Sequence, residues 1–261
     1  VLSSDPEIMK LTADELLLKY QVRCLLHTWM ADVIVEENKV KGGIVENVDG
    51  RKAIMAKIVV DCTGNGDVIA HAGAGFNISP ELQPMTLPFF LAEVNPQGSV
   101  GYEDELTIPF GPGPGFLGKE LLTEYTSRRR DVGIDREMLS NASEADELPF
   151  FGGPWFGGLR KNYPWVNTTR VYGSAVNANE LTAAEMEARS DAHRIVNYYK
   201  KHCKGFENSW IMNTSATIGI RETRRLDGVY TMTKNDIVSN RKFEDSIALG
   251  VWPIDVHPPK N

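Results

Sequence analysis

Residues 57–76 constrain the fold most, because a short apolar run, a glycine turn and a helical segment follow one another directly. Residues 58–60 are β-branched and apolar, which favours a buried strand of a parallel sheet. The next residues, DCTGNGD, hold two glycines that permit a sharp turn and close approach of the backbone to a ligand. Asp67 can cap the helix that follows. This stretch therefore predicts a buried strand, a glycine turn and a helix.

Two interpretations of the glycine turn stay open. A strand that leads through glycines into a helix N-terminus forms an edge where anions and cofactors bind. Many strand-to-helix turns, however, use Gly and Asp for their geometry alone. Cys62 lies inside the turn, where it is either a reactive thiol at the helix N-terminus or a small packing residue.

Composition and charge exclude several classes of function. The 261 residues are 42% hydrophobic, enough for a sizeable core, and carry a formal charge of -7, which argues against a nucleic-acid-binding surface. No apolar run reaches the roughly 18 residues that a membrane span needs. Cys24, Cys62 and Cys203 are widely spaced and follow no metal-ligand pattern, which predicts buried thiols in the reducing cytoplasm and no metal site.

The first 76 residues predict a helix followed by strands. Ser4 and Pro6 are typical of a helix start, and a helix to about residue 19 follows. Turn-forming residues at 36–38 and 48–51 separate apolar runs and predict a three-stranded antiparallel meander. The predicted strands are 22–27, 28–36, 39–48 and 53–60.

From residue 77 to about 164, Pro and Gly become frequent and the hydrophobic periodicity breaks up, which predicts a second, mostly β domain with long loops. The longest predicted helix is 180–204, with Thr182 and Glu185 at capping-box spacing and Gly205 as its stop. We expect an acidic loop at 144–147. The other predicted elements are strands at 85–94, 106–110, 165–172, 210–220 and 228–233, and a helix at 119–130.

A G-x-G-x-x-G match at residues 113–118 does not predict a dinucleotide site. Pro112 and Pro114 remove amide donors from the loop that would have to hold a pyrophosphate. No β-α-β unit with a buried parallel strand surrounds the match either. We interpret it as an ordinary loop.

Arg221, Arg224 and Arg225 form a cluster that could grip a carboxylate or phosphate in bidentate fashion. Local pairing with Glu222 and Asp227 explains the same pattern equally well. Among the histidines, His257 is the candidate acid or base, because it stands in an irregular segment next to prolines.

Three motifs together resemble those of the FAD-dependent oxidoreductases of the glutathione-reductase-like flavoprotein group. The turn CTGNGD resembles that family's A-T-G-D-G-D, with Cys62 in place of the usual Ala. GIRETRR at 219–225 and DSIALGVWPIDVH at 245–257 resemble G-I-R-E-T-R-R and D-x-I-A-x-x-x-x-P-I-D-x-H. The resemblance implies a fold that is α/β plus α+β: a partial FAD/NAD(P)-binding-like domain at 1–76, containing the meander, joined to a mixed, β-rich substrate domain at 77–261.

The resemblance also implies site residues. Val22 would lie on the strand whose backbone contacts the adenine, and the glycine turn would lie beside the dinucleotide. Arg221, Arg224 and His257 would face the flavin or the substrate and act in catalysis. The implied cofactor-binding residues are Val22, Asp61, Cys62, Thr63, Gly64 and Asp67.

The implied function is hydride transfer between FAD and a small, anionic or polar organic substrate. Only the middle of the family's three FAD-binding segments has a counterpart here, so we expect an internal fragment that alone is inactive and holds FAD weakly or not at all. The alternative is a non-catalytic ligand-binding or interaction domain derived from the flavoprotein substrate domain.

Overall fold

The computed structural model describes residues 6–95, 134–157, 163–250, 254, 256 and 257. It combines helices with antiparallel sheets, and its contacts separate the chain into two compact units. The first unit contains Val1–Arg23, Pro84–Gly173 and Asn177–Arg221, and the second contains Cys24–Gln83, Ser174–Val176 and Glu222–Asn261. The predicted division into 1–76 and 77–261 stays a prediction.

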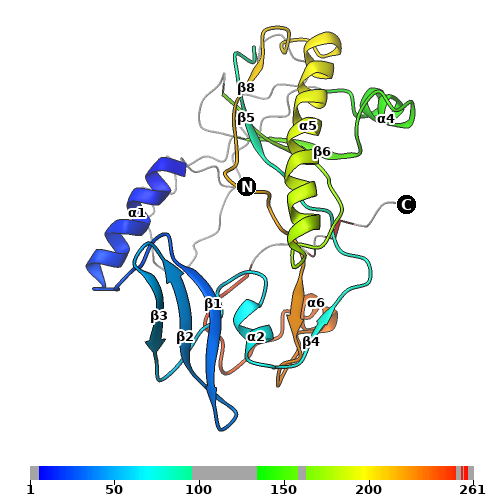
Figure 1. Cartoon of the computed structure of the whole chain (residues 1–261). Helices are drawn as coiled ribbons and strands as arrows, with labels where there is room; N and C mark the ends of the chain where they lie inside the picture. The colour runs from blue at the N-terminus through cyan, green and yellow to red at the C-terminus, as the bar shows by residue number, and fades with distance from the viewer. Residues whose placement is uncertain (1–5, 96–133, 158–162, 251–253, 255, 258–261) are drawn as a thin grey trace, which may run out of the picture. The chain divides into compact units, whose positions relative to one another are not determined.

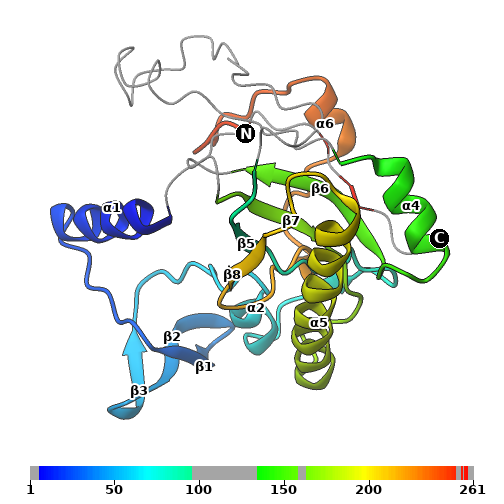
Figure 2. The ribbon, with the colours of Figure 1, turned by 90° about the horizontal axis from the view of Figure 1, so that it is seen from above.

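The first unit is built on a four-stranded antiparallel sheet in the order β6-β7-β5-β8. The long helix α5 packs against β7 and β8, as both ribbon views show (Figure 1, Figure 2). The strands and helices of this unit are α1 (Pro6–Lys19), β5 (Phe89–Ala92), α4 (Arg136–Glu144), β6 (Phe151–Gly157), β7 (Trp165–Thr169), α5 (Ala178–His202) and β8 (Trp210–Thr214).

Helix α5 shows why the sequence pattern predicts it well. Its buried residues recur every three to four positions, so one stripe faces the sheet. Three of them are alanines, which allow close approach, and Tyr199 and Phe206 fill the core beside them. The buried positions on the helix are Ala184, Ala188, Asp191, Ala192, Ile195, Val196 and Tyr199.

The predicted start of this helix was wrong by a few residues. Asn177 is the N-cap, and its side chain accepts hydrogen bonds from the amides of Asn179 and Glu180. Thr182 lies inside the helix instead, where its hydroxyl donates to the carbonyl of Ala178. Gly205 follows the helix with a φ of 91°, in agreement with the predicted stop.

The second unit contains the meander, and here the sequence prediction is confirmed. Strands β1 (Trp29–Glu36), β2 (Lys39–Asn47) and β3 (Gly50–Met55) form an antiparallel sheet in sequential order. Helix α2 (Asp67–His71) contacts β1. A second, two-stranded sheet pairs β4 (Phe76–Ile78) with β9 (Arg224–Leu226), and α6 (Lys234–Val238) follows.

The predicted buried strand before the glycine turn was wrong. Residues 57–60 have no strand conformation, and the side chains of Ile58 and Val60 are 81% and 76% exposed. A strand forms only where a neighbouring strand hydrogen-bonds to its backbone amides and carbonyls, and no described strand pairs with residues 57–60. The apolar pattern alone therefore did not decide its structure.

Other differences follow the same principle. The predicted strands 22–27 and 228–233 are irregular, whereas β9 forms at Arg224–Leu226 because β4 pairs with it. Helix α4 was not predicted; Asp135 caps it by accepting from the amides of Glu137 and Met138. The predicted strand 106–110, the helix 119–130 and the rejected motif at 113–118 lie outside the described residues.

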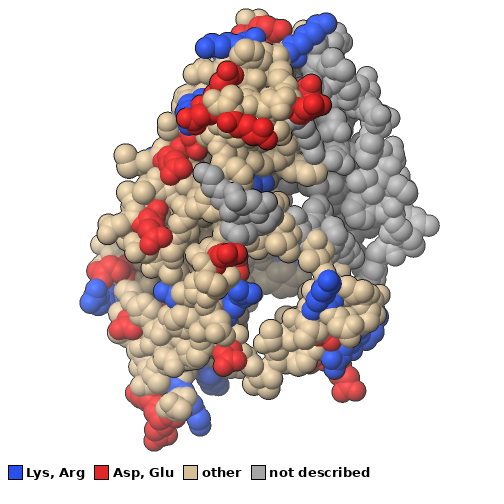
Figure 3. Space-filling view, turned by 90° about the vertical axis from the view of Figure 1, so that its right-hand side faces the viewer, with Lys and Arg blue, Asp and Glu red and all other residues tan. Residues whose placement is uncertain are grey.

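No described helix is long and apolar enough to cross a membrane. On the face shown in Figure 3, acidic and basic side chains of the described residues lie interspersed among neutral ones. No group of three or more metal-binding side chains occurs in the described part of the chain.

Candidate functional site

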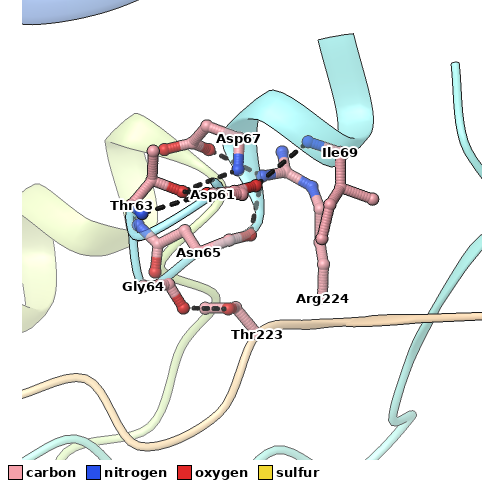
Figure 4. Close-up of polar contacts among 8 residues, drawn as sticks. All are labelled: Asp61, Thr63, Gly64, Asn65, Asp67, Ile69, Thr223 and Arg224. Carbon is pink, nitrogen blue, oxygen red and sulfur yellow. Dashed lines mark hydrogen bonds and ion pairs between the residues drawn. The ribbon is translucent and has the colours of Figure 1, made fainter. Parts of the chain in front are cut away.

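Asp61 organises the glycine turn of the second unit (Figure 4). Its carboxylate accepts hydrogen bonds from the amide of Thr63 at 3.0 Å and from the hydroxyl of Thr63 at 2.7 Å. Its other oxygen accepts from the amide of Ile69 in α2 at 3.0 Å. The Thr63 hydroxyl in turn accepts from the amide of Asp67 at 2.9 Å. One carboxylate thus fixes both the entry of the turn and the first turn of the helix.

The expectation that Asp67 caps this helix was therefore wrong. Asp67 is its first residue; the N-cap is Gly66, with a φ of 66°, a conformation that glycine adopts without strain. The amides of the first helical turn are capped instead by Asp61 and Thr63, which precede the helix in the sequence: Thr63 accepts from the amide of Asp67, and Asp61 accepts from the amide of Ile69. Aspartate six residues before the helix was not recognised as a cap because usual capping patterns span only three or four residues.

The ionisation of Asp61 reflects this arrangement. Partial burial opposes ionisation, but hydrogen bonds from the hydroxyl and amide of Thr63 and from the amides of Ile69 and Val68 outweigh it. The pKa of Asp61 is therefore lowered from its ordinary value. The carboxylate is charged at neutral pH and its turn is most stable in that form.

Arg224 ties the turn to strand β9. Its Nη1 donates to an Asp67 carboxylate oxygen at 2.7 Å and to the carbonyl of Asn65 at 3.1 Å. The guanidinium also lies over the ring of Phe76, 5.5 Å from its centroid. With a side chain only 17% exposed, Arg224 is a partly buried connection between segments that are 157 residues apart.

Thr223 adds a second link, since its hydroxyl donates to the carbonyl of Gly64 at 3.4 Å. The sequence analysis did not single out this residue, although it lies within the GIRETRR motif. Thr223 lies between Arg221 and Arg224, which were selected for their charge, and this position could have marked it as a site residue. In the structure, Thr223 and Arg224 together hold the carbonyl side of the glycine turn.

The residues of the turn fit the phosphates of a dinucleotide cofactor. Within the described part of the chain, no hydrogen bond is recorded from the amides of Gly64, Asn65 or Gly66. Gly64 and Gly66 have φ angles of 80° and 66°, and a Cβ on Gly64 would meet nothing within 4 Å. Successive amides in such alternating conformations form an anion-binding concavity. The turn thus offers backbone donors and open space.

The other predicted cofactor-binding residues divide between the units. The prediction of buried thiols was right only for Cys203: Cys24 is exposed, and Cys62 is an exposed thiol in the turn rather than a small buried packing residue. Val22 belongs to the first unit, where its side chain is exposed and its amide donates to the carbonyl of Leu17 just after α1. The strand on which the resemblance would place Val22 is absent among the described residues.

The three predicted catalytic residues also divide. Arg224 lies in β9 and donates to the glycine turn. Arg225 forms with Glu222 the local pair that the sequence had left as an alternative, at 3.0 Å. His257 joins the same unit through its backbone: its amide donates to the side-chain oxygen of Gln83, and the backbone amide of Gln83 donates to the Glu222 carboxylate. Arg221 belongs to the first unit and donates to the Thr86 hydroxyl at 2.9 Å.

We expect Asp61→Asn to lower the free energy of unfolding by about 1–3 kcal/mol at neutral pH, because an amide side chain has one acceptor oxygen where the carboxylate has two. A lowered folded-state pKa stabilises the protein fully above the pKa of the unfolded carboxyl, about 3.9. That contribution is lost as the pH falls toward the folded-state pKa.

Urea unfolding at a series of pH values measures this effect. The difference between wild type and Asp61→Asn should be full at neutral pH and shrink below about pH 4. Asp14→Asn on the exposed face of α1 is the control, with an expected change within about 0.5 kcal/mol. A pH-independent difference for Asp61→Asn would contradict the role assigned to its charge.

Comparison with known proteins identifies the family. The model of the family described as FAD dependent oxidoreductase matches residues 2–261, so the chain belongs to that family. Neither the search of curated proteins nor that of solved structures returned a match.

Proposed function

We propose that this member of the FAD dependent oxidoreductase family acts as a flavoenzyme that transfers a hydride between FAD and a small organic substrate, anionic or polar in character. The observation that carries the proposal is the glycine turn: the amides of Gly64, Asn65 and Gly66 donate to no residue in the described part of the chain, and the space beside Gly64 is open. Such a turn suits the negatively charged phosphates of a dinucleotide.

The roles of the turn residues follow from their contacts. Gly64 and its neighbours would donate to the dinucleotide, while Asp61 and Thr63 hold the backbone in the required conformation. Asp67 would act through Arg224, which it binds at 2.7 Å, rather than on the anionic cofactor directly. Cys62, being exposed, would border the cofactor. Val22 remains a proposed adenine contact on the grounds of the resemblance alone.

When bound, FAD would supply the redox chemistry itself, accepting or giving a hydride at its isoalloxazine ring. The chain's own residues would orient the substrate and manage charge and protons. We propose that Arg221 binds an anionic group of the substrate and that His257 moves a proton. Arg224 is better suited to positioning the turn, because its guanidinium already donates to Asp67 and Asn65.

We further propose that the remaining FAD contacts come from segments other than these 261 residues. The 261-residue chain alone should then be colourless, inactive and weak or undetectable in FAD binding. Titration with FAD, followed by quenching of flavin fluorescence, measures this directly. A yellow protein purified from the 261-residue chain would contradict it.

The role of the turn is tested in the protein isolated with its natural flavin content. Gly64→Ala should weaken FAD binding at least tenfold, because the new methyl group would occupy open space beside the turn that we assign to the cofactor. Gly73→Ala is the matched control: Gly73 has a φ of 72° and equally open surroundings, but it lies after α2. Both variants bear the same backbone strain, about 1–2 kcal/mol.

Equal FAD affinity of Gly64→Ala and Gly73→Ala would show that the glycine turn is not part of the cofactor site. A natural protein that contains no flavin and binds none would favour the other class considered, a non-catalytic ligand-binding domain.

A further inference from the structure

A short segment of the second unit, residues 222–225, contacts two other segments of the chain. Thr223 and Arg224 donate to the glycine turn (Figure 4). The residue before them, Glu222, accepts instead from the backbone amide of Gln83 at 3.1 Å. Three consecutive residues therefore connect the glycine turn with the segment that contains Gln83.

Gln83 extends this connection to His257. The side-chain oxygen of Gln83 accepts from the backbone amide of His257 at 3.1 Å. Gln83 is 139 positions from Glu222 and 174 from His257, so three distant parts of the sequence meet at one glutamine. All three residues belong to the second unit.

The Glu222 carboxylate is well suited to hold the Gln83 amide. The Glu222 side chain is only 14% exposed, and its oxygens have separate partners: Oε1 pairs with Arg225 and Oε2 accepts from Gln83. A hydrogen bond to an ionised acceptor is about twice as strong as one between neutral groups. Pro84, which follows Gln83, favours an extended backbone at Gln83. The backbone of Gln83 is therefore held in place, and its side chain presents an oxygen to His257 at a defined position.

This connection bears on the proton transfer proposed for His257. A general acid or base acts only within hydrogen-bond reach of the reacting group, and a displacement of about 1 Å can lower the rate about 100-fold. Residues 222–224 hold the glycine turn directly and the backbone of His257 through Gln83. One segment thus sets the position of the proposed acid or base relative to the turn that we assign to the cofactor.

We propose that Gln83 is a positioning residue: held by Glu222, it fixes the backbone of His257 relative to the glycine turn and so supports proton transfer. This inference rests on the proposed function, because it requires His257 to move the proton. Gln83 itself moves none, since its amide side chain does not titrate near neutral pH. The sequence analysis did not identify Gln83, which lies in none of the three motifs.

Substitutions of Gln83 test the proposal in the protein isolated with its natural flavin content. Gln83→Met keeps the length of the side chain but removes the acceptor oxygen, so kcat should fall about tenfold to 100-fold at unchanged FAD affinity. Gln83→Glu keeps an acceptor oxygen and should stay within about threefold of the wild type. The matched control is Gln21→Met at an exposed residue of the first unit, which should leave kcat unchanged. Small anionic and polar organic compounds serve as reductants of the flavin in this assay.

Hydrogen exchange of the His257 amide measures its position without reference to turnover. Pro253, Pro258 and Pro259 have no amide hydrogen, so a peptide covering residues 253–260 contains few exchanging amides and its mass reports mainly on this segment. Gln83→Met should speed exchange in this peptide by about tenfold or more. Gln83→Glu and Gln21→Met should exchange as the wild type does, and an unchanged circular dichroism spectrum verifies that each variant is folded.

A second pair of variants tests the contribution of Glu222. Glu222→Leu removes the acceptor of the Gln83 amide together with the ion pair to Arg225, whereas Arg225→Ala removes only the ion pair. Only Glu222→Leu should speed exchange at His257. Equal exchange rates in the two variants would contradict the role of the Glu222 carboxylate.

Unchanged hydrogen exchange in Gln83→Met, or equal losses of kcat in Gln83→Met and Gln83→Glu, would overturn the proposal. Faster exchange with wild-type turnover in Gln83→Met would overturn it too if His257→Gln is impaired, because the contact would then be purely structural. Wild-type turnover in both Gln83→Met and His257→Gln would contradict the proposed role of His257 instead. Hydrogen exchange needs no flavin, so it decides whether Gln83 holds His257 even if the natural protein binds no FAD.

Discussion

Replacing Arg224 by alanine is expected to lower the free energy of unfolding by about 2–3 kcal/mol and to weaken FAD binding at least tenfold. The Arg224 side chain is 17% exposed, and its guanidinium makes a 2.7 Å ion pair with Asp67 as well as a hydrogen bond to the Asn65 carbonyl. Hydrogen bonds to charged groups contribute about 1.5–3 kcal/mol to stability. Without them, the amides of the turn lose the fixed geometry that a dinucleotide requires.

The neighbouring residue provides the control. Arg225 makes an ion pair of 3.0 Å with Glu222, but its side chain is 63% exposed. Exposed pairs contribute little, so Arg225→Ala should change the unfolding free energy by less than about 1 kcal/mol. Urea unfolding and flavin fluorescence titration of the two variants measure both effects. Equal losses in both variants would show that the connection between β9 and the turn has no special importance.

Replacing His257 by glutamine is expected to lower turnover about 100-fold or more, because general acid–base catalysis contributes roughly 10²–10⁴-fold to rate. The backbone amide of His257 is held by Gln83, which in turn bonds to Glu222, so the residue is connected to the segment that carries Arg224. Glutamine keeps a polar side chain and leaves the backbone contact intact. FAD affinity should therefore stay close to that of the wild type.

Turnover is followed as bleaching of the oxidised flavin's visible absorbance when a panel of small anionic and polar organic compounds is added to the natural flavoprotein. His71→Gln is the control: His71 is on the exposed surface of α2 and bonds to Asp32 at 3.1 Å. It should retain wild-type turnover. Wild-type rates for His257→Gln would remove this residue from the catalytic proposal, whereas a loss of bound flavin would assign it to binding.

Helices and strands that are stabilised by contacts between residues close in the sequence could be predicted. The meander formed as expected, because turns at 36–38 and 48–51 bring adjacent strands together without distant contacts. Helix α5 formed because its buried residues repeat with the period of a helix. Residues 57–60 have an equally clear apolar pattern. A strand, however, needs a neighbouring strand to pair its backbone amides and carbonyls, and the local sequence does not predict that neighbour.

The candidate site shows the same division. Sequence motifs singled out the glycine turn, GIRETRR and His257, whose functional roles stay predictions. The sequence motifs did not show that Arg224 pairs with Asp67, because the two residues are 157 positions apart. By charge alone, Glu222 and Asp227 were equally suitable partners for Arg224. The motifs gave no reason to select Gln83, which belongs to none of them.

The sequence by itself determined the helices with periodic apolar faces, the meander and the backbone freedom of the glycine turn, since these depend on interactions between near neighbours. Only the tertiary structure decided which arginine holds the turn and which residue connects Glu222 with His257. The physical reason is that a guanidinium or an amide group bonds to any acceptor within its reach. Which acceptor that is depends on how distant strands pair, as β4 pairs with β9.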